Sequence, residues 1–230
     1  MHSRIRSMFA AALGLALTCS LAHAQLLLSG YTTGSFVDLS EPNTTVSNAG
    51  DGSWATFHTG IAATGSTQSK IEFSNTTFTD VASGDPIQVG LFEITNGMTL
   101  IGSGAPTAQF NLGLELTSPV MQSVALTQIT FHVDHTPNLP GAIPDTFSAS
   151  FTQPTAMKIG DYLVQFHVNF DPAEFQVAEN TMVQRGDITV SFTPVPEPAT
   201  YAAWGAALLV GLVGYRRLRA RSAASLPAAA

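Results

Sequence analysis

Cysteine is almost absent from this chain of 230 residues, because Cys19 is the only one. Cys19 lies within the signal peptide that the sequence predicts over residues 1–24, so we expect the mature protein to have neither a disulfide bond nor a thiol for catalysis or metal binding. Its main region, residues 25–193, is long enough to bury roughly two-thirds of its surface without cross-links. We therefore expect an apolar core to stabilise the fold.

Positive charge is also scarce outside the two ends of the chain. All sixteen acidic residues lie between Asp38 and Glu197, where only Lys70, Lys158 and Arg185 oppose them. The strongly negative net charge of this region argues against nucleic acid or an anionic polysaccharide as a partner held by bulk electrostatics. It suits solubility or the binding of divalent cations.

Catalytic motifs are missing as well. The chain has no Gly-x-Ser-x-Gly, and Gly102-Ser103-Gly104 lacks the lysine of a phosphate-binding loop. Glu93 and Glu115 could be paired carboxylates for glycoside hydrolysis, which need a separation of about 5 to 9 Å, or simply solvent-facing residues. Trp54 is the only tryptophan of residues 25–193, which is little for stacking on sugars. We predict no catalytic residues and no enzymatic activity.

The amino-terminal segment has the three parts of a secretory signal peptide. Arg4 and Arg6 give a positive start, and an apolar run over Met8–Leu17 follows. Ala22-His23-Ala24 is a small-x-small cleavage site. The sequence therefore predicts a signal peptide over residues 1–24, with Ala22 and Ala24 before the cut and Gln25 after it. Export through the Sec translocon follows from this prediction.

The carboxyl-terminal segment also has three parts. Pro196-Glu197-Pro198 precedes an uncharged apolar run, Ala199–Tyr215, and four arginines come next. These are Arg216, Arg217, Arg219 and Arg221. A helix over the apolar run is roughly 25 Å long, just enough for a thin bilayer. Because arginines stay in the cytoplasm, the preceding residues lie outside the inner membrane. We predict one transmembrane helix in the tail, residues 194–221, and disorder over 222–230.

This tail resembles the PEP-CTERM sorting signal of Gram-negative, polysaccharide-producing bacteria. The resemblance covers about the last thirty-five residues and rests on Pro196-Glu197-Pro198, the apolar run and the arginines. It implies that an exosortase, a membrane-embedded cysteine protease, cleaves near the Pro-Glu-Pro sequence. It also implies transit through the inner membrane and delivery to the cell surface or extracellular matrix. A permanent single-pass anchor is the alternative.

Residues 25–193 have the pattern of an all-β domain. Short apolar and β-branched runs alternate with turn residues, and Phe110, Leu112, Leu114 and Leu116 recur with period two. The other expected strands are Ser35–Leu39, Trp54–His58, Lys70–Phe73, Thr77–Val81, Ile87–Thr95, Met98–Ile101, Val124–Val133, Thr146–Phe151, Tyr162–Phe170 and Asp187–Phe192. We expect hairpins at Ser74-Asn75-Thr76 and at Asn96-Gly97. The sequence predicts one antiparallel, jelly-roll-like β-sandwich.

This layout resembles the choice-of-anchor K domain of bacterial surface proteins. The features that carry it are Gly30, Gly34-Ser35-Phe36, the strands around Ile71–Phe78, Val89-Gly90-Leu91 before Asn96-Gly97, and Thr136-Pro137-Asn138 followed by Asp145. The resemblance would cover most of Ser29–Phe170. It implies a β-sandwich at the cell surface and no known reaction.

Calcium is the best candidate for a bound metal. Acidic and amide side chains cluster in the expected loops, and calcium prefers such oxygen ligands. The candidate ligands are Asp38, Glu41, Asp51, Asp134, Asn138 and Asp145. Ordinary turn chemistry is the alternative interpretation. The stretch His132-Val133-Asp134-His135 is a weaker metal candidate, with His132 and Asp134 on one strand face and His58 or His167 as distant partners.

Two functions remain open. The first is a non-enzymatic surface or matrix protein that is linked to exopolysaccharide or biofilm. The second is a secreted protein that binds or hydrolyses carbohydrate with acidic loops and possibly calcium.

Overall fold

The computed structural model describes residues 27–37, 39, 41–82, 84, 86–100, 103–136, 143–160, 162–195 and 198–223. The chain divides into two compact units, of which one is Leu26–Thr193 and the other combines Met1–Gln25 with Pro194–Ala230. The signal peptide predicted over residues 1–24, together with Gln25, Pro196 and Glu197, lies outside the described residues. We call Leu26–Thr193 the β domain and describe the helix after it separately.

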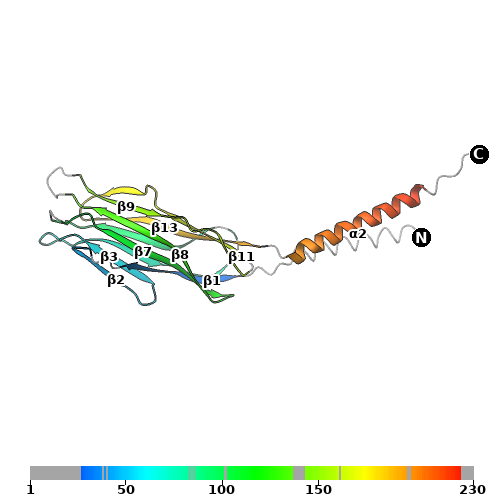
Figure 1. Ribbon diagram of the computed structural model, residues 1–230, viewed down its shortest axis with the longest axis horizontal. Helices are drawn as coiled ribbons and strands as arrows, with labels where there is room; N and C mark the ends of the chain where they lie inside the picture. Colours follow the sequence, from blue (N-terminus) through cyan, green and yellow to red (C-terminus); the bar gives the residue numbers. More distant parts are fainter. Residues whose placement is uncertain are drawn as a thin grey trace, which may run out of the picture. The chain divides into compact units, whose positions relative to one another are not determined.

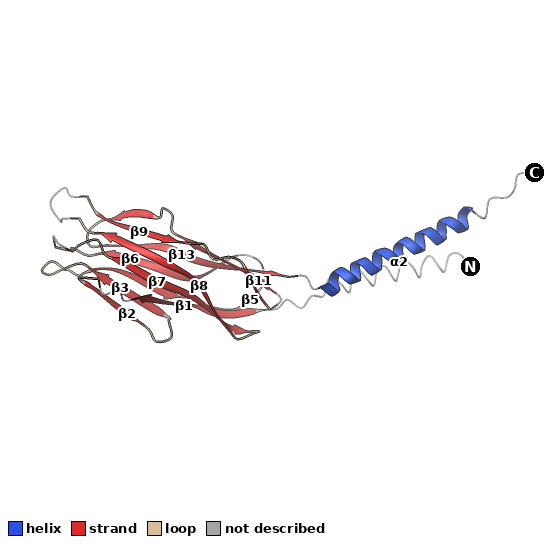
Figure 2. Ribbon diagram, viewed as in Figure 1, coloured by secondary structure: helices blue, strands red, loops and turns tan. Residues whose placement is uncertain are grey.

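Two antiparallel sheets form the β domain (Figures 1 and 2). The six-stranded sheet runs in the order β12 (Glu174–Val177), β9 (Asp145–Phe151), β8 (Gln122–Asp134), β7 (Thr107–Ser118), β1 (Leu28–Val37) and β5 (Thr77–Val81). The seven-stranded sheet runs in the order β10 (Met157–Ile159), β11 (Tyr162–Asn169), β13 (Thr181–Pro194), β6 (Ile87–Asn96), β4 (Ser69–Asn75), β3 (Trp54–Thr59) and β2 (Thr44–Asn48). The predicted all-β sandwich is confirmed at this level.

The core lies between the two sheets and is rich in phenylalanine. On β7 the side chains with period two all point inward, and each is at most 2% exposed. The ring of Phe92 on β6 lies 5.0 Å from that of Phe110 and 5.2 Å from that of Phe131, measured between centroids. Because β6 belongs to one sheet and β7 and β8 to the other, these rings join the two layers.

Both predicted hairpins are wrong. Strands β4 and β5 lie in different sheets, so the chain crosses the sandwich at Thr76 instead of turning back. Strand β6 pairs with β4 and β13, and Asn96 is fully buried at its end. A Cβ on Gly97 would lie 2.0 Å from the Thr67 carbonyl oxygen, so this glycine permits a close backbone approach. Turn residues mark where a strand ends, but they do not specify which sheet the next strand joins.

A helix, α2 (Pro198–Ala223), forms in the tail. Within the described part of the chain, however, no helix is both long and apolar enough to cross a membrane. The structure therefore does not support the transmembrane span predicted over Ala199–Tyr215. That run contains three glycines, and the threonine, tyrosine and tryptophan residues near its ends further lower its mean hydropathy.

Candidate functional site

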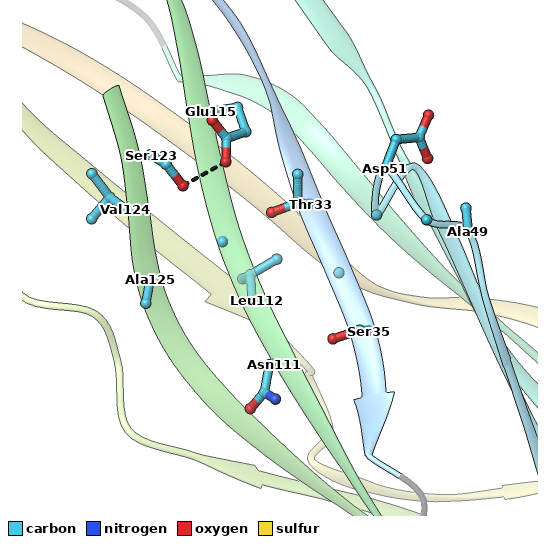
Figure 3. A pocket seen from close by; sticks show the side chains of 14 residues that line it. Thr33, Ser35, Ala49, Asp51, Asn111, Leu112, Glu115, Ser123, Val124 and Ala125 are labelled. Carbon is cyan, nitrogen blue, oxygen red and sulfur yellow. Dashed lines mark hydrogen bonds between the residues drawn. The ribbon is translucent and has the colours of Figure 1, made fainter. Parts of the chain in front are cut away.

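A groove of about 420 Å³ lies on the outer face of the six-stranded sheet (Figure 3). Strands β1, β7 and β8 line it together with the turn of residues 49–52, which joins β2 to β3. The lining residues are Thr33, Gly34, Ser35, Ala49, Gly50, Asp51, Gly52, Asn111, Leu112, Gly113, Glu115, Ser123, Val124 and Ala125.

The strand register explains why this face is hollow. Gly113 on β7 lies between Thr33 on β1 and Ala125 on β8, so the middle row of side chains is small. Two rows with longer polar side chains flank it. One row consists of Tyr31, Glu115 and Ser123, and the other consists of Ser35, Asn111 and Gln128.

The turn of residues 49–52 forms one wall of the groove. The Gly34 amide donates to the Gly52 carbonyl oxygen at 2.9 Å and attaches the turn to β1. Gly52 has φ +71°, and a Cβ there would lie 2.9 Å from the Cβ of Thr33. Glycine at this position therefore allows both the turn conformation and its close contact with β1.

The groove carries negative charge and hydrogen-bonding groups. The Ser123 hydroxyl donates to Glu115 Oε1 at 2.5 Å, and Gln128 Nε2 donates to Asn111 Oδ1 at 3.1 Å. Hydrogen bonds from Ser53, from its hydroxyl and then its backbone N–H, lower the pKa of Asp51 at the rim. No lysine or arginine is among the described lining residues.

The predicted calcium ligand Asp145 is fully buried and bonded within the protein. Its Oδ2 lies 2.8 Å from His135 Nδ1, and its Oδ1 accepts from the Thr136 amide at 2.7 Å and from the Thr136 hydroxyl at 3.1 Å. The other ring nitrogen of His135 lies 3.2 Å from the Thr59 hydroxyl. We call this set of contacts the His135 cluster. Its side chains tie the start of β9 to the opposite sheet.

The remaining calcium candidates do not come together with Asp145. Asp51 lies on the rim of the groove, Asp134 is exposed at the end of β8, and the Glu41 carbonyl accepts from the Thr44 hydroxyl at 2.7 Å. Asp38 and Asn138 lie outside the described residues. In the ranges that the structure describes, no three His, Cys, Asp or Glu residues are grouped to hold a metal. Calcium stays a prediction.

The histidines are dispersed. His132 and Asp134 are exposed on the outer face of β8, and His135 points inward, as the strand pattern predicts. His167 is exposed on β11. His58 lies on β3, where burial and then the charge of Lys70 lower its pKa. This arrangement gives the weaker metal hypothesis no support.

Glu93 and Glu115 do not face a common cleft. Each alternates with buried residues, and they lie on the outer faces of opposite sheets. The residue beside Glu93 is instead Glu72 on β4, which forms an ion pair with Lys70 at 2.5 Å. The interpretation of Glu93 and Glu115 as a hydrolytic pair is therefore wrong.

A second group of buried polar residues lies beside the His135 cluster. The Ser69 hydroxyl donates to Asn96 Oδ1 at 3.0 Å, and Asn96 Nδ2 donates to the Val177 carbonyl at 2.7 Å. Burial, and then the charge of Asp145, raise the pKa of Glu179. Its Oε2 is buried and has no hydrogen-bond partner among the described residues. These residues come from separate strands and loops, so no local sequence pattern indicated them.

In the tail, Pro198 begins α2 and all four predicted arginines lie within the helix. Arg216 and Arg217 are exposed.

No model of a known protein family matches this chain, and no curated protein matches it. The resemblances to the PEP-CTERM signal and to the choice-of-anchor K domain therefore rest on their short motifs and stay predictions.

Proposed function

We propose that the chain is an exported, non-enzymatic surface or matrix protein whose carboxyl-terminal tail is a sorting signal of the PEP-CTERM type. The observation that carries this proposal is the order of features after the β domain. Pro-Glu-Pro comes first, an uncharged run follows, and four arginines come last. The division of the chain between Thr193 and Pro194 is compatible with a removable tail, because the β domain is a compact unit without it.

The proposed route begins at the Sec translocon and passes through the inner membrane. An exosortase-like protease then removes the tail, and the jelly-roll-like domain remains at the cell surface, near extracellular polysaccharide. The proposal requires the apolar run to insert into the membrane at least transiently. Arginines at its end favour an orientation with the carboxyl terminus in the cytoplasm.

The test is the intact mass of protein released from the surface of an exosortase-bearing Gram-negative host. We expect a chain that begins at Gln25 and ends near residues 196–198. A species that keeps the four arginines and stays in the inner membrane would show a permanent anchor instead.

A matched pair of variants tests the role of the arginines. Replacing all four with glutamine should leave unprocessed precursor, because the charge that retains the terminus inside is lost. The control Lys158→Gln removes a cation from the β domain and should be processed normally. Normal delivery of the fourfold variant would contradict the proposal.

The alternative is a secreted carbohydrate-binding protein. The groove on the six-stranded sheet favours this alternative over carbohydrate hydrolysis, because it offers hydrogen-bonding groups, whereas Glu93 and Glu115 lie on opposite faces.

A further inference from the structure

We propose that the groove between β1, β7, β8 and the turn of residues 49–52 binds a short segment of a neutral polysaccharide. The groove belongs to the β domain and not to the tail. Glycan binding and tail processing are therefore separate properties, and either can fail without the other.

The size of the groove fits an extended chain. Rows on one face of a strand are two residues apart, so the two polar rows that flank Gly113 are separated by about 13 Å. Neighbouring strands are about 4.8 Å apart, so the hollow crosses its three strands in about 10 Å. These dimensions admit a sugar chain one ring wide and about two rings long. The turn with Gly52 forms the wall beside β1.

The hydrogen-bonding groups of the groove suit sugar hydroxyls. Thr33, Ser35 and Ser123 bring hydroxyl groups to it. Glu115 accepts from Ser123 through Oε1 and Asn111 accepts from Gln128 through Oδ1, so within the described structure a carboxylate oxygen and an amide donor remain for a ligand. A sugar hydroxyl can donate to the first and accept from the second.

Tyr31, which is not one of the lining residues, brings an aromatic side chain to the row next to the groove. It is the cross-strand partner of Glu115 and lies on the same outer face of the sheet. An aromatic ring beside hydrogen-bonding groups is an amphipathic surface of the kind that packs against a sugar ring.

Charge selects against other ligands. Glu115 and Asp51 are not opposed by a cation among the described lining residues, so they would repel a phosphate or a uronic acid. An apolar ligand would cover the Glu115 carboxylate and the Asn111 amide and offer them no hydrogen bond in place of water. Calcium needs six to eight oxygen ligands. Asp51 is turned away from the centre of the groove in Figure 3 and is bonded to Ser53, so among the described lining residues Glu115 is the one carboxylate inside the groove.

The experiment is a binding titration of the purified full chain in buffer free of glycoside detergents. The probes are four neutral hexasaccharides (cellohexaose, maltohexaose, laminarihexaose and mannohexaose), with hexagalacturonate and calcium chloride as further arms. We expect at least one neutral hexasaccharide to bind with a Kd near or below about 1 mM, and no binding of hexagalacturonate. Binding of none of the four, equal binding of hexagalacturonate, or binding of calcium alone would overturn the proposal.

Three variants locate the site. Ala125→Trp fills the middle of the groove from an exposed strand position and should weaken binding at least about tenfold. Thr130→Trp places the same ring on the outer face of β8 outside the groove, and binding should stay within about twofold of the unmodified chain. Equal loss in both variants, or loss in neither, would overturn the assignment. The double variant Ser35→Ala with Asn111→Ala removes two hydrogen-bonding groups without adding bulk, and it should also weaken binding.

Discussion

In the middle of the β domain the two sheets meet through aromatic rings, whereas at the His135 cluster and the buried polar residues next to it they meet through hydrogen bonds. Phe92 contacts Phe110 and Phe131 across the middle. At the other place, His135 reaches the Thr59 hydroxyl and Asn96 reaches the Val177 carbonyl. Close-packed apolar contacts depend on the volume of each side chain, while buried hydrogen bonds depend on the presence of every partner. The two regions should therefore respond differently to substitution.

The largest effect should come from the aromatic middle. Phe92→Ala removes a fully buried ring that contacts four other phenylalanines, namely Phe73, Phe110, Phe131 and Phe170. We expect the free energy of unfolding to fall by about 3–5 kcal/mol, measured by urea denaturation. Phe92→Leu keeps part of the side-chain volume and should lower the free energy of unfolding clearly less. A loss below about 1 kcal/mol in Phe92→Ala would mean that the rings do not join the sheets.

The His135 cluster should respond to a change of almost no volume. Asp145→Asn puts an amide group where His135 and the Thr136 amide need acceptors, and it leaves a buried donor without a partner. We expect a loss of about 2–3 kcal/mol in the same assay. Asp134→Asn is the control, since Asp134 is exposed at the end of β8, and its cost should be near zero. Equal effects for the two variants would contradict the structural role of Asp145.

Overpacking should show how tightly the middle is filled. A Cβ on Gly34 would lie 2.1 Å from Cζ of Phe110 and 2.7 Å from Phe73, so Gly34→Ala forces the rings to move. We expect the free energy of unfolding to fall by about 1–3 kcal/mol, measured by urea denaturation. Gly50→Ala is the matched control, because nothing lies within 4 Å of the Cβ position there. If Gly34→Ala were neutral, the aromatic middle would be looser than these contacts imply.

The same contrast explains what the sequence could predict. The inward faces follow from alternation, as Phe110 to Leu116 show, because a strand with one buried face must alternate. The hairpin at Ser74-Asn75-Thr76 is wrong because β4 and β5 belong to different sheets, and the hairpin at Asn96-Gly97 is wrong because β6 pairs with β4 and β13. The turn residues carry no information about either pairing.

The candidate site was missed for a related reason. The groove depends on the pairing of Gly113 with Thr33 and Ala125, and the His135 cluster joins residues far apart in the chain. The sequence singles out Asp145 and Asp51 as candidate calcium ligands, but a loop acid next to a glycine or proline has the same sequence pattern whether it is buried or exposed.

The smallest predicted effect concerns pH and Glu179, whose carboxyl group lies beside Asn96 and is influenced by Asp145 and His135. Burial raises its pKa above the ordinary value of 4.5, so the folded protein holds this proton more tightly than the unfolded chain. Its contribution to stability is therefore greatest below pH 4.5 and is lost as the pH rises through the folded-state pKa.

Glu179→Gln keeps the shape of this side chain but cannot ionise. Relative to the unmodified protein, it should therefore gain stability between pH 4 and pH 7, by less than about 1 kcal/mol because the side chain is partly exposed. Urea denaturation at several pH values measures this difference. Glu174→Gln, on the exposed side of β12, is the control and should follow the unmodified protein. A difference that is constant with pH would show that Glu179 acts through packing and not through its charge. The region around the His135 cluster would then depend on side-chain volume, as the aromatic middle does, more than its hydrogen bonds suggest.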